Sequence, residues 1–494
     1  MIHVPPFFGS GRRAPALRRQ LTLAPLVMVV FFTVCGGAYG LEPLVQESGP
    51  GMALLLIAVT PLIWALPTAA MSAELSAAIP AEGGYYVWVK RGLGSFWGFQ
   101  EGWWSWLASF VDMAIYPVLF ASYLAVLLEG LFGITVLEDN PWVRWGVILA
   151  LTWSLALLNV RGVRGVGRMA VVCAVLVLLP FAVMSALGLI RLAEAPVPFW
   201  EPFVPPEESL WGAFGVGLFV VMWNYQGWDG VSTVNGEVVD PRRVAPRALW
   251  IALPLVILAY FLPVLAGLVG TPDWTLWEEG FFPAAGAAVG GQWLGVWLGI
   301  AGLVSAAGLY GANLLSVSRL PFVMADDGYL PKGLARLHPR YGTPWIAILL
   351  CAVVHSVFAL GAFASLVVID VMLYAAGLLL EFAALIALRI KAPHLRRPVR
   401  VPGGWPGVIL ATALPMAVVT LAVVSTLQTE GAGALYISLA ALASGPLLYP
   451  VCALLFKRGR PDVDVAPEPD AAAAGVWPGR LARLAPAAQP RWTP

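Results

Sequence analysis

Charged residues are scarce in this sequence. Only 12% of its 494 residues are Asp, Glu, Lys or Arg, whereas a soluble globular chain carries about a quarter. Hydrophobic residues make up 60%, the mean hydropathy is +0.81, and these residues form about twelve runs, each long enough for a helix to cross a bilayer. An ordinary soluble protein is therefore excluded, and the sequence predicts an all-α integral membrane protein with about twelve transmembrane helices.

Residues that support metal, redox or nucleotide chemistry are also rare. No CxxC, HExxH, GxxxxGKS or GxxxxGKT motif occurs, so we expect no metal site, no cofactor and no enzymatic activity such as ATP hydrolysis. The net charge is +1 without a long basic run, which argues against nucleic acid as a partner. All four cysteines lie in apolar runs and are predicted to be small buried residues: Cys35, Cys173, Cys351 and Cys452.

The two ends of the chain differ from the rest. The sequence GRRAPALRRQLTLAPLVMVVFFTVCGG (11–37) imitates a twin-arginine signal peptide with Cys35 at a lipobox-like position. We expect an uncleaved first span instead, because the run continues to Glu42 and many spans follow. Residues 1–20 are predicted to be cytoplasmic, and 457–494, rich in Ala, Pro and Arg, to form a disordered cytoplasmic tail.

Hydropathy and helix length together predict the spans. A helical membrane domain is expected over 21–456. The predicted spans are 21–44, 51–77, 96–128, 142–160, 166–191, 210–239, 246–270, 290–324, 344–362, 365–388, 407–427 and 434–456.

Basic residues are concentrated in alternate loops. One set of loops contains groups such as Arg242 and Arg243, whereas the opposite set contains only Arg144 and Arg191 and many acids such as Glu207. Because positively charged loops stay on the cytoplasmic side, both termini are predicted to be cytoplasmic. We expect a multi-pass protein of the cell membrane, in contact with lipid.

Glycines interrupt two of the predicted spans, at CGGAYG (35–40) and NYQGWDG (224–230). Glycine lets the backbone leave helical geometry, and the freed N–H and C=O groups are tolerated where they line a cavity. The two interruptions lie five spans apart, and such paired breaks point to an inverted repeat with a substrate site at the bilayer midplane. The alternative is that these glycines serve close helix packing.

Three stretches resemble the amino acid–polyamine–organocation superfamily: ALPTAAMSAELSAAIPAEGGYYVWVKRGLGSFWGFQEGWWSW (65–106), NYQGWDGVSTVNGEVVDPRRVAPRA (224–248) and RRPVRVPGG (396–404). WDGVSTVNGEV (228–238) and SFVDMAIYPVLF (109–120) are most similar to its polyamine:proton symporter branch, which is related to L-type amino acid transporters. The resemblance covers residues 20–456.

The resemblance implies a fold and a mode of action. It implies a 5+5 inverted repeat with discontinuous spans 1 and 6 and two extra helices, over about 21–191, 210–388 and 407–456. It also implies alternating access without ATP. Light chains of heteromeric L-type transporters carry a cysteine in the external loop after span 3. Here that loop, 129–142, has none, so no disulfide-linked heavy chain is expected.

Polar residues inside the spans are the candidate substrate site. Asp229 follows three aromatic residues that could form an ammonium cage with it, and Asp112 offers a second carboxylate for a substrate with more than one positive charge. A gating or structural role for these acids, and a packing role for the other candidates, are the alternatives. The candidates are Gly36, Gly37, Tyr39, Glu42, Asp112, Trp223, Asn224, Tyr225, Gly227, Trp228, Asp229, Tyr310 and Asn313.

Three further residues bear on coupling. Glu237 and Glu381 lie nearer the cytoplasm and are predicted to pair with arginines there. His355 lies within a span and could relay protons, although a simply hydrogen-bonded histidine is the more common case. Span 5 has no lysine, the residue that some proton-coupled relatives place there instead of a sodium ion, so the coupling ion stays open.

Together these features predict a secondary active transporter that imports cationic polyamines of the putrescine or spermidine type, or amino acids, by proton-coupled alternating access. The alternative is a general permease for neutral or cationic amino acids, coupled to protons or sodium or acting as an exchanger. An intramembrane enzyme lacks a catalytic cluster at one depth, and a receptor lacks a sizeable soluble domain.

Overall fold

The computed structural model describes residues 17–360, 364–429 and 432–457. Its regular structure in these ranges is helical, apart from one isolated β-bridge between Leu21 and Val238. The elements in chain order are α1 (Leu23–Val34), α2 (Glu42–Ser48), α3 (Pro50–Thr60), η1 (Pro61–Ala65), α4 (Leu66–Ala78), α5 (Gly84–Leu93), α6 (Ser95–Phe132), α7 (Val136–Asp139), α8 (Pro141–Arg161), α9 (Val163–Glu194), α10 (Leu210–Asn224), η2 (Gly230–Glu237), α11 (Pro241–Gly270), η3 (Trp274–Leu276), α12 (Phe282–Gly290), α13 (Gln292–Val317), α14 (Arg319–Asp326), η4 (Lys332–Ala335), α15 (Trp345–Phe358), α16 (Ala364–Lys391), α17 (Gly404–Thr429), α18 (Ala432–Cys452) and η5 (Ala453–Lys457).

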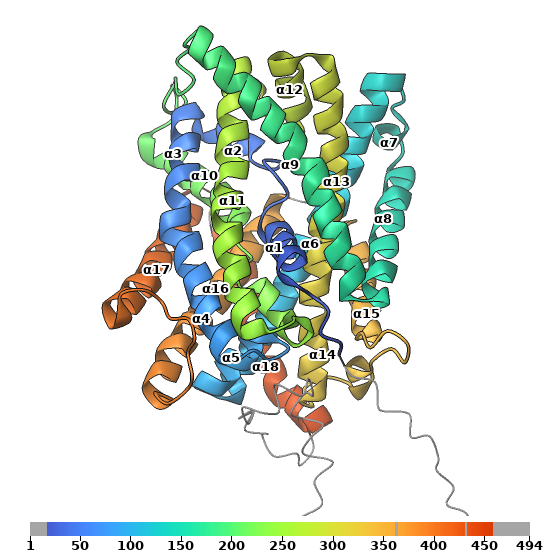
Figure 1. Ribbon diagram of the computed structural model, residues 1–494, viewed down its shortest axis with the longest axis vertical. Helices are drawn as coiled ribbons and strands as arrows, with labels where there is room; N and C mark the ends of the chain where they lie inside the picture. Colours follow the sequence, from blue (N-terminus) through green and yellow to red (C-terminus); the bar gives the residue numbers. More distant parts are fainter. Residues whose placement is uncertain (1–16, 361–363, 430–431, 458–494) are drawn as a thin grey trace, which may run out of the picture.

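The helices form one elongated bundle in which most of them run along the long axis (Figure 1). In the described part of the chain, nine helical segments are long and apolar enough to cross a membrane, and three shorter apolar helices, α1, α10 and α15, join them. The predicted all-α membrane fold with about twelve spans is confirmed. Residues 1–16 of the predicted cytoplasmic segment and 458–494 of the predicted tail lie outside the described residues.

Local sequence chemistry fixes several helix ends. The side chain of Asn140 accepts hydrogen bonds from the first amides of α8, and the hydroxyl of Ser209 accepts one from Gly212 at the start of α10. The longest helix, α6, begins after Gly94 and ends at Gly133, both with positive φ. These caps satisfy backbone groups that a helix end leaves without an intrahelical partner.

Both predicted breaks are present. The first span stops at Val34 and restarts as α2 at Glu42, and the sixth changes from α10 to the 3-10 helix η2 across residues 225–229. Gly227 has φ +94°, and a Cβ there would lie 2.3 Å from the carbonyl oxygen of Thr33. Glycine is therefore required at this position twice over, for the left-handed backbone and for the close approach of the two breaks.

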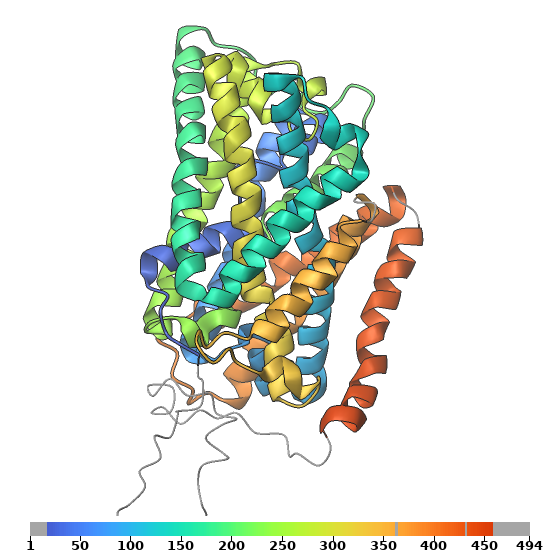
Figure 2. The ribbon, with the colours of Figure 1, turned by 90° about the vertical axis from the view of Figure 1, so that its right-hand side faces the viewer.

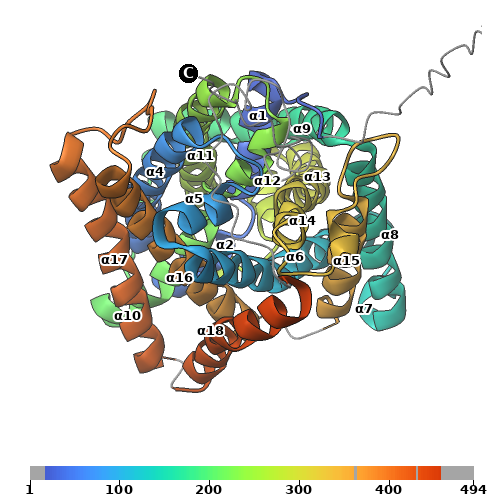
Figure 3. The same ribbon diagram turned by 90° about the horizontal axis from the view of Figure 1, so that it is seen from below.

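The breaks lie in the middle of the bundle. Residues of α6, α13 and α16 line a cavity beside them, whereas α17 and α18 lie at the periphery of the bundle, as Figure 3 shows and as the red helix at the right of Figure 2 illustrates for α18. This arrangement matches the expected core of broken spans with two extra helices outside it. The end of the bundle with α5 and α14, at the bottom of Figure 1, is called the lower end below.

Candidate functional site

A cavity lies beside the two breaks, with about 980 Å³ of empty space, part of it open to solvent. Its polar lining consists of Thr33, Tyr39, Tyr85, Ser105, Ser109, Asp112, Tyr116, Tyr123, Trp223, Asn224, Gln226, Asp229, Tyr260, Ser305, Asn313, Ser316, Asp370 and Tyr374. Among the described residues that line it there are three aspartates and no lysine or arginine.

Each aspartate is held by a neutral donor. The Tyr116 hydroxyl donates to Asp112 over 2.8 Å, and the side-chain amide of Gln226 donates to Asp370 over 2.8 Å. The hydroxyl of Tyr374 donates to Asp229 over 2.5 Å. Asp229 and Asp370 are buried and Asp112 is partly exposed. The cavity therefore offers negative charge that no basic residue of its described lining neutralises, and a cation is its electrostatic complement.

Two backbone amides at the breaks already donate hydrogen bonds to side chains. Glu42 accepts a hydrogen bond from the amide of Gly40 over 2.6 Å and one from the hydroxyl of Tyr123 over 3.0 Å. The amide of Gly227 donates to the hydroxyl of Tyr374 over 3.0 Å. These amides are thus not free to bind an anionic group of a ligand without a rearrangement.

Eight of the thirteen candidates line the cavity: Gly36, Tyr39, Asp112, Trp223, Asn224, Gly227, Asp229 and Asn313. Asn224 also bridges the breaks, since its amide donates to the carbonyl of Gly40 over 3.3 Å. The side chain of Asn313 donates to the carbonyl of Phe32 over 3.2 Å, which ties α13 to α1.

The other candidates lie outside the cavity lining. Gly37 packs against α9, where a Cβ would meet Val177 and Phe181, and Glu42 is fully buried as described above. The predicted ammonium cage of three aromatics does not form, because only Trp223 of the three faces the cavity. Tyr225 donates to the carbonyl of Ile57, and Trp228 is completely buried.

Tyr310 also lies away from the cavity. Its hydroxyl is 3.2 Å from Nδ1 of His355, and both side chains are buried. His355 thus has a hydrogen-bond partner on α13, whereas its Nε2 atom has none. This pair lies between α13 and α15, and among the described residues no hydrogen bond joins it to an aspartate of the cavity.

The sequence reasoning missed several residues of the lining. Asp370 and Tyr374 of α16 were not singled out, nor were Tyr85 of α5 and Gln226. Asp370 carried the same signal as Asp112, an aspartate inside an apolar run (LVVIDVMLY, 366–374), and could have been found by it.

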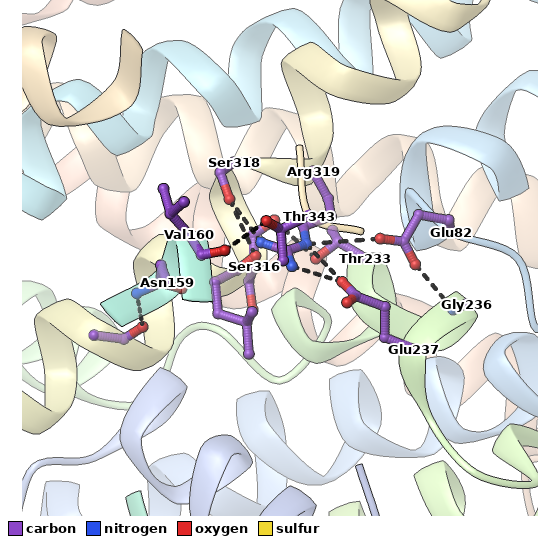
Figure 4. Close-up of polar contacts among 12 residues, drawn as sticks. Glu82, Asn159, Val160, Thr233, Gly236, Glu237, Ser316, Ser318, Arg319 and Thr343 are labelled. Atoms are coloured by element: carbon purple, nitrogen blue, oxygen red, sulfur yellow. Dashed lines mark hydrogen bonds and ion pairs between the residues drawn. The ribbon is translucent and has the colours of Figure 1, made fainter. Parts of the chain in front are cut away.

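The prediction for Glu237 is confirmed. Arg319 is fully buried, and its guanidinium donates to Glu237 from two nitrogens, over 2.6 and 2.9 Å. Figure 4 shows Glu82 approaching the same guanidinium at 3.7 Å while it accepts a hydrogen bond from the amide of Gly236. Burial away from water, together with the nearby Glu237, raises the pKa of Glu82, which lies in the loop between α4 and α5.

The corresponding prediction for Glu381 is wrong. Its carboxyl group lies beside that of Asp229, and among the described residues no ion pair joins it to an arginine. Arg389, the arginine two turns further along α16, is instead bound to Glu74 of α4. The neighbour of this buried glutamate is thus another acid, not an arginine.

Ion pairs of the described chain gather at the lower end. Lys90 pairs with Asp327 at 2.7 Å, and Arg397 and Arg389 both pair with Glu74. With Arg319 and its two glutamates, these pairs join segments from both halves of the chain beneath the cavity. They close the bundle at that end.

Comparison with known proteins supports the fold and the family. The amino acid permease family matches residues 26–445. The chain is 36% identical to "Polyamine transporter RMV1" of Arabidopsis thaliana over 443 residues, which covers 89% of this chain and 87% of that protein. It is also 36% identical to "Polyamine transporter PUT1" of Oryza sativa subsp. japonica over 451 residues, covering 91% and 81%.

A solved structure shares the fold. The crystal structure of MhsT in complex with L-phenylalanine superposes with a TM-score of 0.62 at 14% sequence identity, covering 82% of this chain and 99% of that one. The likeness supports the broken-helix architecture alone. The family match over most of the chain, the two relatives and the motifs of spans 2, 3 and 6 lead to one conclusion: the chain is a membrane transporter, not an enzyme, and belongs to the amino acid permease family of the amino acid–polyamine–organocation superfamily.

Proposed function

We propose that this transporter imports cationic polyamines of the putrescine or spermidine type, by alternating access coupled to protons. The observation that carries the proposal is the cavity with three aspartates and, among its described lining residues, no basic side chain. Buried carboxylates held only by neutral donors favour a ligand that brings positive charge. The names of the two plant relatives agree with such a substrate.

The placement of the aspartates favours more than one ammonium group. We infer that Asp112 on α6 and Asp370 on α16, which both line the cavity, form one acidic pole. Asp229 forms a second pole through Tyr374, which is four residues from Asp370 on the same helix. Four residues rise ~6 Å along a helix, which sets the backbone spacing of Asp370 and Tyr374. We infer that the two poles are spaced for a short diamine. Tyrosines and Trp223 add aromatic side chains to the lining of the same cavity.

The same cavity is a poor match for an amino acid. A substrate carboxylate needs free backbone donors at a break, or a cation. Here Glu42 holds the amide of Gly40, and Tyr374 holds that of Gly227. The carboxylate of an amino acid substrate would also be repelled by the three aspartates. Neutral or cationic amino acids are the alternative substrates, and the experiment below distinguishes them from polyamines.

Direction and coupling belong to the proposal too. The lower end carries the basic residues, so we place it and both termini in the cytoplasm and the protein in the cell membrane. Proton coupling is favoured over sodium because the acidic groups around the cavity can themselves carry protons.

The test is uptake of labelled putrescine into proteoliposomes that contain the purified full chain. We expect uptake that rises with an inward proton gradient, needs no ATP, and is inhibited by spermidine but not by leucine or lysine. Inhibition by amino acids at concentrations similar to putrescine would favour the amino acid alternative. Uptake that follows sodium and ignores pH would remove the proton coupling.

A further inference from the structure

Two buried glutamates lie behind Asp229, outside the lining of the cavity. Glu101 is on α6 and Glu381 on α16, and their side chains are 0% and 1% exposed. Helices α6 and α16 pack against each other, and a Cβ at Gly377, one turn before Glu381, would lie 3.0 Å from the carboxylate of Glu101. The missing side chain at Gly377 makes the room in which the carboxyl group of Glu101 sits.

These glutamates have few partners. Glu101 accepts one hydrogen bond, from the hydroxyl of Ser105 over 3.1 Å, and its second oxygen has no partner. Glu381 contacts Asp229, and its Oε2 atom has no partner either. An unpaired carboxylate oxygen in a dry interior is costly unless the group is neutral or meets a cation.

The surroundings supply no compensating charge. The titratable groups that face the glutamates are Asp229 at the start of η2, Tyr374 on α16 and Tyr85 on α5. The lysines and arginines of the neighbouring segments are engaged further down: Lys90 with Asp327, and Arg389 and Arg397 with Glu74. In the described part of the chain, the other helices that pack on α16 add no further charged group to this cluster: α4, α10, α17 and α18.

A hydrogen bond between two carboxyl groups needs a proton on one of them, because a carboxylate has no donor. A proton shared by Asp229 and Glu381 would thus lie between an acid that lines the cavity and one that does not. Asp229 is in addition the acceptor of the Tyr374 hydroxyl, which prepares it to carry negative charge.

We propose that Glu381 holds the coupling proton, with Glu101 as the second acceptor beside it. This inference rests on the proposed proton-coupled function. In the empty transporter Asp229 and Glu381 share one proton. When an ammonium group of the substrate reaches Asp229, the O–H bond on Asp229 breaks and one on Glu381 forms. Asp229 then neutralises the ammonium group, Glu381 is neutral, and proton and substrate are released together on the cytoplasmic side.

The test is accumulation of labelled putrescine in proteoliposomes with an inward gradient of one pH unit and the membrane potential held at zero. One coupled proton should concentrate putrescine about tenfold in the wild type, since one pH unit is a tenfold ratio of proton activity. Glu381→Gln keeps the size and can still donate to Asp229, but it cannot carry the proton. We expect its accumulation ratio to fall to about one, while exchange of labelled for unlabelled putrescine at equal pH continues.

The outcomes separate the two proposals. Glu207→Gln, at an exposed acid of the opposite end, is the matched control and should behave as the wild type. A wild type that ignores the gradient contradicts the proposed coupling itself. A gradient-driven wild type with an equally gradient-driven Glu381→Gln variant overturns only the role of Glu381.

A measurement on the wild type covers the case in which the variant does not fold. Infrared difference spectra on addition of putrescine should show the carbonyl band of a protonated carboxyl group shifting to a new position, because the proton changes its acceptor. Loss of that band, as expected if the proton leaves on binding, or an unchanged band would each overturn the proposal.

Discussion

Asp370→Asn isolates the charge of one acidic pole. Asp370 is 2% exposed, and it accepts a hydrogen bond from the neutral side-chain amide of Gln226. The side-chain oxygen of an asparagine can still accept that hydrogen bond. The substitution therefore keeps shape and hydrogen bonding and removes only the charge. An ammonium group ~4 Å from a carboxylate gains ~4 kcal/mol at an effective dielectric constant of ~20, before desolvation reduces that gain.

The net loss can be bounded. Interactions with a charged partner typically contribute ~1.5–3 kcal/mol after desolvation, which corresponds to a rise of about 10- to 100-fold in the Kd of putrescine. Butylamine, with one ammonium group, can bind at Asp229 alone and should weaken by less than about threefold, under ~0.7 kcal/mol. The exposed residue Asp139 at the end of α7, changed to Asn, is the control.

The assay is titration of the purified chain with each amine at neutral pH. An equal loss for putrescine and butylamine would mean that Asp370 acts on the whole cavity rather than on a second ammonium group. An unchanged affinity for putrescine would refute the two-pole arrangement.

Three further predictions concern the frame around the site. Gly227→Leu should abolish putrescine uptake while the protein still reaches the membrane, because a side chain there meets the carbonyl of Thr33 at 2.3 Å; near-normal uptake would show that the close approach is dispensable. Arg319→Met should destabilise the purified protein by ~3–5 kcal/mol, because buried carboxylates lose their partner, whereas Arg243→Ala, in a pair exposed at 75% and 53%, should change its melting temperature little. A tag inserted beside Glu207 should be accessible on intact cells and a tag at either terminus should not; the reverse pattern would invert the proposed orientation.

The spans and their breaks were predictable because hydropathy and glycine act locally. A run of about twenty apolar residues has few other uses than a membrane helix, and a cluster such as 35–40 cannot continue one. Asp229 and Asp112 followed from the same local signal, a charge where hydrocarbon forbids it.

The direction of side chains around the break was not predictable. Tyr225 and Trp228 were placed in an ammonium cage because they are close to Asp229 in the sequence, but the left-handed turn at Gly227 interrupts the helix and with it the regular direction of side chains. Helix pairing was equally hidden, because nothing local shows that α16 packs on α6. The partners of Glu381 and Asp370 come from that contact.

A structure of the transporter with putrescine bound tests the central claim most directly. The two-pole cavity predicts one nitrogen of putrescine within about 4 Å of the carboxyl group of Asp229 and the other within about 4 Å of Asp112 or Asp370, the separation of an ion pair. Both nitrogens at a distance from all three aspartates, or an amino acid bound there with its carboxylate on the amide of Gly40 in place of Glu42, would contradict it.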